Sequence, residues 1–168
     1  MAGRRLELRQ GPGRGYLVVY GDAAAHGRVG RPRAQKEARR RIEVVNRAAE
    51  VFLRRRLFKR ASDGRVIRSE FVALHYPLYW HYDYLGGLRA MAQVGLARDP
   101  RCADALDLLE ERRLPGGGWP AEKRYYKVSP KAMVSNADYV AWGGTGPKRM
   151  NEWVTVDALT VLRSAGRL

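Results

Sequence analysis

The sequence contains a single cysteine, Cys102, among its 168 residues. One thiol cannot form an intrachain disulfide, and it excludes any zinc site that needs more than one thiolate from this chain. Long apolar runs are also missing, so no segment is predicted to cross a bilayer. The basic first residues lead into glycines and not into the apolar core of a secretory signal. These absences together predict a cytoplasmic protein.

Lysine is scarce, because only six of the 32 basic residues are lysines and 26 are arginines. With 17 acidic residues the net charge is +15, and clustered cations bind nucleic acids by releasing counterions from phosphates. About half of this excess lies in the first quarter of the chain, and the bias toward arginine is typical of a GC-rich genome. Solubilising charge is therefore the favoured interpretation, and a nucleic-acid partner is the less favoured alternative.

The first part of the chain is rich in glycine and arginine and has one short apolar run, Tyr16-Leu17-Val18-Val19-Tyr20. Its glycines lack the spacing of a phosphate loop, and no Gly-Lys-Ser/Thr follows them. We expect residues 1–34 to form a basic, poorly ordered tail, and residues 35–168 to form a helical domain.

Apolar residues in the rest of the chain recur at the helical spacing of three and four. The first predicted helix runs from Gln35 to about Phe58. A second begins at Pro77 and covers about 78–94; it is apolar nearly all round and should be buried, with its Gly86-Gly87 pair allowing close approach of another helix. The core positions expected in the first helix are Ala38, Ile42, Val45, Ala49, Phe52 and Leu53.

Two further helices carry clear capping signals. Asp99-Pro100 starts a third helix that ends near Arg113, and Asn151 caps a last helix over about 152–165, which Gly166 ends. In the last helix Trp153, Val156, Leu159 and Leu162 are expected to face the core. Residues 115–150 between these helices form a long irregular connection, which in compact domains is typical of functional loops.

Weak internal repeats run through the helical part. A shift of 57 positions aligns residues 49–57 with 106–114, and a shift of 71 aligns the helix after Pro77 with the last helix. Repeats of this length are typical of solenoids and toroids, in which single units cannot bury their apolar faces alone.

Several motifs carry a resemblance to a known family: residues 79–85 (Tyr-Trp-His-Tyr-Asp-Tyr-Leu), Asp99-Pro100-Arg101, Gly118-Trp119-Pro120 and residues 151–155 (Asn-Glu-Trp-Val-Thr). Over about residues 48–168 the chain resembles bacterial proteins with prenyltransferase and squalene-oxidase-type repeats. The resemblance implies part of the α/α toroid of squalene cyclases, built from repeated antiparallel helix hairpins.

The resemblance carries no activity with it. The Asp-x-Asp-Asp acid of the cyclases is missing, and Asp99-Pro100-Arg101-Cys102 is one residue too long for the Asp-x-Cys zinc element of the prenyltransferases. The toroid also closes with more helix pairs than this chain supplies. Either the chain is the C-terminal part of a shortened relative, or a second subunit, which can be a second copy, completes its core.

The strongest cluster of candidate side chains lies at the entry to the predicted buried helix, where aromatic faces could line a pocket for an apolar or cationic ligand. His81 and Asp83 are weak catalytic candidates, as a proton donor or acceptor in an enclosed cavity. They are too close in sequence to share a helix face, so a direct pair between them is not expected. The candidate binding residues are His75, Trp80, His81, Tyr82, Trp119, Tyr126, Trp142 and Trp153.

These observations favour an all-α, non-catalytic binding or scaffold protein with an apolar cavity. His75 and His81 could bind a metal only with a third ligand from elsewhere, such as Asp83 or Asp104, so no metal and no other cofactor is expected. Two alternatives stay open. One is an enzyme acting on an isoprenoid or another apolar substrate, and the other is an arginine-rich nucleic-acid-binding protein.

Overall fold

The structure is a computed structural model and describes residues 31–126 and 142–168. These residues form four helices, α1 (Arg31–Leu53), α2 (Tyr84–Gln93), α3 (Ala103–Glu111) and α4 (Glu152–Ala165), and the short 3-10 turns η1 (Ser69–Val72) and η2 (Pro100–Cys102). Extended pairing within them is limited to three isolated bridges. The predicted all-α class is confirmed for this part of the chain. Most of the expected tail, residues 1–34, and the middle of the 115–150 connection lie outside the described residues.

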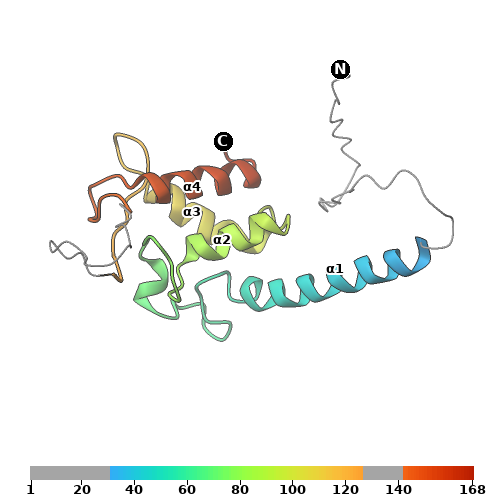
Figure 1. The fold of residues 1–168 in the computed structure, drawn as a ribbon. Helices are drawn as coiled ribbons and strands as arrows, with labels where there is room; N and C mark the ends of the chain where they lie inside the picture. Colours follow the sequence, from blue (N-terminus) through green and yellow to red (C-terminus); the bar gives the residue numbers. More distant parts are fainter. Residues whose placement is uncertain (1–30, 127–141) are drawn as a thin grey trace, which may run out of the picture.

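Helix α2 lies at the centre of the molecule and contacts both α3 and α4 (Figure 1). Its side chains Leu85, Leu88 and Met91 are buried, as expected from the nearly continuous apolar sequence. The indole of Trp119, from the connection after α3, completes the same core and donates a hydrogen bond from Nε1 to the Leu109 carbonyl at 2.6 Å. Trp119, one of the predicted binding residues, is therefore buried in the core.

The prediction that α2 begins at Pro77 is wrong. The helix begins at Tyr84, and Asp83 is its N-cap, accepting a hydrogen bond from the Gly86 amide at 2.7 Å. Pro77 follows a cis peptide bond in an irregular segment. Six residues expected in the buried helix therefore precede it, and the Trp80 side chain among them is 84% exposed. An aspartate N-cap satisfies free amides of the first turn, which a proline seven residues earlier cannot do.

The bounds of α4 agree with the sequence, but the face that it buries does not. Asn151 caps the helix by accepting from the amides of Trp153 and Val154, both at 3.1 Å. However, Trp153, Val156 and Leu159 are 43%, 59% and 39% exposed. Leu162 is buried as predicted, and the other buried positions are Val154, Ala158 and Val161. Because α4 is apolar on several faces, its apolar periodicity is compatible with more than one buried face.

Helix α1 ends at Leu53, before the predicted Phe58, because Arg56 and Leu57 turn the chain with φ of 43° and 69°. Only its last part packs on the other helices, and most of the helix projects away from them (Figure 1). Ile42 and Val45, which were expected in the core, are 52% and 39% exposed. The sequence therefore predicted the amphipathic pattern of α1, but no described part of the chain covers the apolar face of the outer half of this helix.

The Gly86-Gly87 pair allows close packing, although of side chains and not of a neighbouring helix. A Cβ added at Gly87 would overlap the hydroxyl of Tyr82 and lie 2.7 Å from Cδ2 of Leu57. The same hydroxyl donates a hydrogen bond to the Leu57 carbonyl at 2.6 Å. Gly87 thus permits the contact between Tyr82, just before α2, and Leu57, in the turn after α1.

We expect Gly87→Ala to destabilise the protein by about 1–2 kcal/mol, because the overlap with Tyr82 outweighs the helix propensity gained from alanine. Urea denaturation followed by circular dichroism measures the change. Gly116→Ala is the matched control, since a Cβ there meets nothing within 4 Å. Equal stabilities of the two variants would contradict the proposed packing.

Candidate functional site

The predicted catalytic candidate Asp83 forms a buried pair with His75. One carboxylate oxygen, Oδ2, accepts from the His75 amide and lies 3.1 Å from Nδ1 of its ring. The other oxygen caps α2. Both side chains are 1% exposed. Because Asp83 holds the irregular segment before α2 against the first turn of that helix, its geometry is that of a structural residue.

One nitrogen of the buried His75 ring has no partner. Nδ1 faces Asp83, but the opposite nitrogen, Nε2, has no hydrogen-bond partner among the described residues. A histidine oriented by an aspartate is the arrangement of a general base. Such a base must be within reach of a substrate proton. Here the ring is buried against Tyr125, with ring centroids 4.9 Å apart, and it lines neither of the two surface depressions described below.

His81 lies outside this pair and stacks on Tyr125, with ring centroids 3.6 Å apart and planes inclined by 17°. Trp80 lies beside His81 at 5.5 Å. Neither His81 nor Asp83 lines either of the two described depressions. Burial raises the pKa of the Tyr82 hydroxyl, which stays protonated and serves as a hydrogen-bond donor.

The remaining predicted aromatic residues separate into two places. Tyr126 lies in the connection after α3, where the guanidinium of Arg124 sits 5.9 Å from its ring. Trp142 and Trp153 come together with Tyr76, which sequence reasoning did not single out. We name these three residues the aromatic cluster: the Tyr76 ring stacks on Trp153 at 5.4 Å, and Trp142 meets Trp153 edge-on at 5.8 Å.

The aromatic cluster continues along the outer face of α4. Trp153, Val156 and Leu159, which we name the α4 stripe, are spaced three residues apart and so lie on one side of the helix. All three side chains are more than a third exposed. Apolar surface gathered on one helix face in this way is typical of an interaction site.

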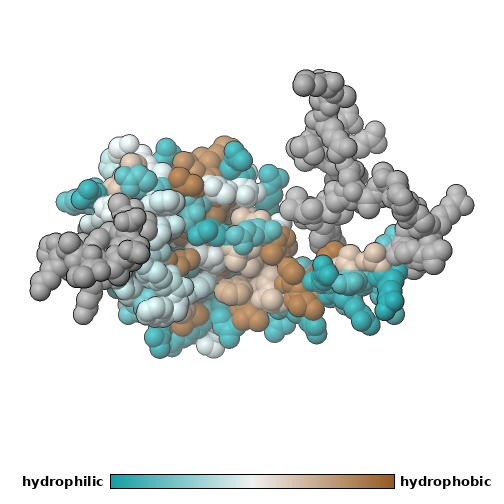
Figure 2. All heavy atoms as spheres, in the orientation of Figure 1, coloured by the Kyte–Doolittle hydropathy of each residue, from teal (hydrophilic) through white to brown (hydrophobic). Residues whose placement is uncertain are grey.

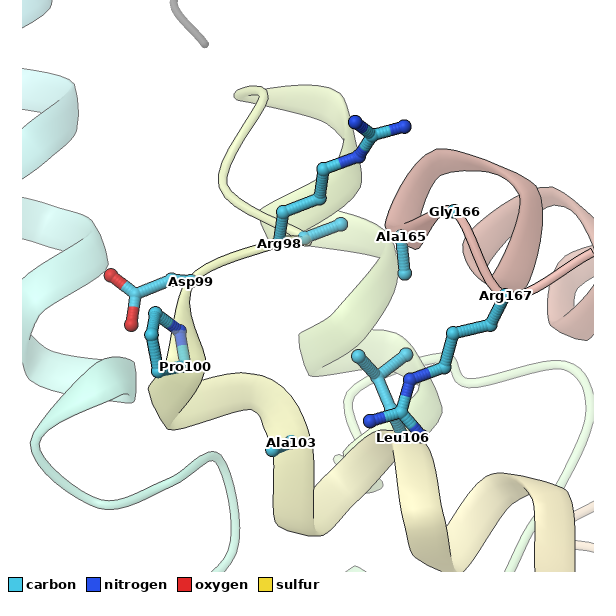
Figure 3. Close-up of a pocket in the computed structure, with 9 residues that line it drawn as sticks. Arg98, Asp99, Pro100, Ala103, Leu106, Ala165, Gly166 and Arg167 are labelled. Carbon is cyan, nitrogen blue, oxygen red and sulfur yellow. The ribbon is translucent and has the colours of Figure 1, made fainter. Parts of the chain in front are cut away.

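A depression of about 370 Å³ lies where the C-terminal end of α4 meets the start of α3 (Figure 3). Arg98 and Arg167 flank it, and both are already engaged. Arg98 donates to the Ser164 carbonyl at 3.2 Å, and Arg167 pairs with two acidic residues of α3 at 2.6 and 2.7 Å. The buried thiol of Cys102 is close in sequence, but burial raises its pKa to about 11, so it is a poor nucleophile near neutral pH.

A second depression, of about 340 Å³, is strongly basic, and sequence reasoning missed it. We name it the basic depression. One acid, Asp104, partly offsets its charge by accepting from Lys59 at 2.5 Å and from Arg56 at 3.1 Å, and the bond from Lys59 lowers the pKa of this carboxyl. The α1 turn and the hairpin after it bring together the lining residues Arg54, Arg56, Lys59, Arg60, Ala61, Gly64 and Asp104.

No group of three histidine, cysteine or acidic side chains within residues 31–126 and 142–168 is placed to hold a metal ion. None of the helices in this part combines the length and apolarity that crossing a bilayer requires. Comparison of the chain with protein-family models, with curated proteins and with solved structures finds no match. The repeat-family resemblance therefore stays a prediction.

We expect Asp83→Ala to cost about 2–4 kcal/mol of stability, since it removes a helix cap and leaves the buried His75 amide without an acceptor. Thermal unfolding measures the loss. The control is Asp63→Ala, in which an exposed side chain that accepts only from the Arg65 amide is removed, at an expected cost below about 1 kcal/mol. Similar losses in both variants would show that the buried pair has no special structural role.

Proposed function

We propose that this protein is a non-catalytic helical binding protein that docks a helix of a second subunit on its aromatic cluster and α4 stripe. The observation that carries the proposal is the orientation of α4, which buries Val154, Ala158, Val161 and Leu162 and leaves Trp153, Val156 and Leu159 exposed. Such residues repeat along one face at the spacing that helix-in-groove partners use. The catalytic alternative lacks comparable support, because Asp83 caps a helix and His75 is buried.

A helical partner fits this surface better than the apolar small molecule considered above. Small ligands bind in concave pockets that enclose most of their surface. The α4 stripe lines neither of the two described depressions. Its residues instead form a row along a helix, which suits side-chain packing against another helix.

Helix α1 offers a matching surface. Ala38, Ile42 and Val45 repeat at spacings of four and three and continue outward from the buried Ala49. We name these three residues the α1 seam. The spacing is that of helices that pack side by side. Because most of α1 projects away from the other helices, its seam is available to a neighbouring molecule (Figure 1).

The partner that we propose is a second copy of this chain, with each α1 seam packing on the α4 stripe of the other copy. Pairing two α1 seams with each other would bring the flanking Arg39 side chains of the two copies together, which like charge disfavours. The α4 stripe is flanked by Glu152 at one end and by Arg163, one turn beyond Leu159, at the other, so its charge is mixed. When each copy packs its α1 seam on the α4 stripe of the other, the two copies form a closed two-fold dimer, and both seams and both stripes are covered.

Light scattering after size-exclusion chromatography tests this assembly. We expect the wild type to have twice the 19.0 kDa mass of the chain and the double variant Val156→Glu/Leu159→Glu to have the mass of one chain, because the added charges would be buried without partners. Val66→Glu, at an apolar position that is 41% exposed and lies outside α1 and α4, should leave the dimer intact. A wild type that stays monomeric at all concentrations, or equal dissociation by Val66→Glu, would rule out the α4 interface.

A further inference from the structure

The arginines of α1 are arranged in a regular row. Arg33, Arg40, Arg47 and Arg54 follow one another at intervals of seven residues, which is about two helical turns and about 10.5 Å per interval. Arg54 directly follows the end of the helix, and its amide still bonds to the Glu50 carbonyl at 3.0 Å. We name these four residues the arginine row, and all of them are exposed.

The acidic residues of α1 lie along the arginine row, because Glu37, Glu43 and Glu50 are each three or four residues from two of its arginines. Glu37 pairs with Arg41 at 2.5 Å, and Glu50 lies closer to Arg101, at 3.0 Å, than to Arg54, at 3.7 Å. Within the described residues no ion pair of 4.0 Å or less involves Arg33, Arg40 or Arg47. The charge of the row is therefore partly offset, but α1 as a whole stays positive, with seven basic and three acidic residues.

The arginine row leads into the basic depression. Arg54 belongs to both, and Arg56, Lys59 and Arg60 extend the positive surface beyond the end of α1. Arg56 reaches this position although its φ of 43° is unfavourable for a non-glycine residue, and strained backbone of this kind is often kept at functional sites. Asp104 is the one carboxylate among the lining residues, and Glu50 and Asp63 lie 3.7 Å from Arg54 and 3.9 Å from Arg60. Four cations therefore face three carboxylates, and the net charge of the depression stays positive.

The row lies on the face of α1 opposite the α1 seam, since its positions are about half a turn from those of Ile42 and Val45. Figure 2 shows this division on the projecting part of α1, where hydrophilic residues follow one edge and a paler, apolar strip lies beside them. A helix docked on the seam would leave the arginines accessible.

From this geometry we infer that the arginine row and the basic depression bind the phosphate backbone of a nucleic-acid duplex. The projecting part of α1 is a rod of the width that the major groove of B-form DNA admits, and arginines at regular intervals along it can reach phosphates. An anionic membrane is the weaker partner, because the exposed apolar residues of α1 are mostly alanine and valine and lack the aromatic anchors of interfacial helices.

Fluorescence anisotropy of the full chain with a mixed-sequence DNA duplex, measured from 50 to 300 mM salt, tests the inference. The row variant is Arg33→Gln/Arg40→Gln/Arg47→Gln. The control variant, Arg68→Gln/Lys148→Gln/Arg163→Gln, removes three exposed cations elsewhere, so both variants have the same net charge and the same first 30 residues. Circular dichroism spectra of the three proteins confirm that each is folded.

The row variant should raise the Kd at low salt by about tenfold or more and lower the slope of log Kd against log salt by about three, one for each lost phosphate contact. The control variant should bind nearly as the wild type does. Equal binding by the two variants, or no duplex binding by the wild type at 50 mM salt, would overturn the inference. An RNA duplex in a parallel titration should bind more weakly, because its major groove is too narrow for the helix.

A phosphatidylserine vesicle serves as the competing partner. If the wild type binds these vesicles through the row but does not bind DNA, the surface is a membrane site and the inference is wrong. The oligomeric state of the row variant is also measured, so that DNA binding and the proposed dimer are tested separately. Because the row faces away from the α1 seam, loss of DNA binding should leave that state unchanged, so the two proposals can fail separately.

Discussion

The buried carboxylate of Asp83 is the contact on which the positions of the other residues near α2 depend. It accepts from the first turn of the helix with one oxygen and from the His75 amide with the other. The chain between these two residues contains no helix or strand, so no regular hydrogen-bond pattern fixes its path. Asp83 thereby sets where α2 begins, and it presents the segment of residues 76–82 at one end of the helical body.

Asn151 performs a related function at the start of α4. Its side-chain oxygen accepts from two amides of the helix, and its side-chain nitrogen donates to the carbonyls of Trp142 and Gly144 at 2.7 and 3.0 Å. The side chain is buried, so all of these bonds are shielded from water. By joining the chain at Trp142 to the first turn of α4, Asn151 places Trp142 against Trp153 and so builds the aromatic cluster.

The sequence predicts the features that depend on neighbouring residues. The caps at Asp99 and Asn151 and the left-handed end of α4 at Gly166, with φ of 74°, follow from short-range rules. Each of these residues satisfies backbone groups within its own turn, so its role does not depend on the fold.

The features that sequence reasoning missed depend on contacts between distant segments. Asp83 pairs with His75 across an irregular stretch whose path no periodicity describes, whereas the sequence drew attention to the adjacent His81. The face of α4 was misassigned because apolar residues occupy several sides of that helix, and only packing against α2 selects Val154 and Ala158 for the core. The basic depression was missed for the same reason, since Asp104 is 45 residues from Lys59 in sequence.

The distribution of charge and apolar surface on α1 connects the two proposals. A helix that projects from its domain gains little stability from tertiary packing, which is the main source of helix stability in proteins. Exposure of the apolar seam on one side of α1 costs free energy because water must hydrate it. Exposure of the arginine row on the other side costs free energy because like charges repel one another. A partner helix on the seam and phosphates along the row would each remove one of these costs. In the two proposals taken together, α1 would contact a protein partner on one face and a polyanion on the opposite face.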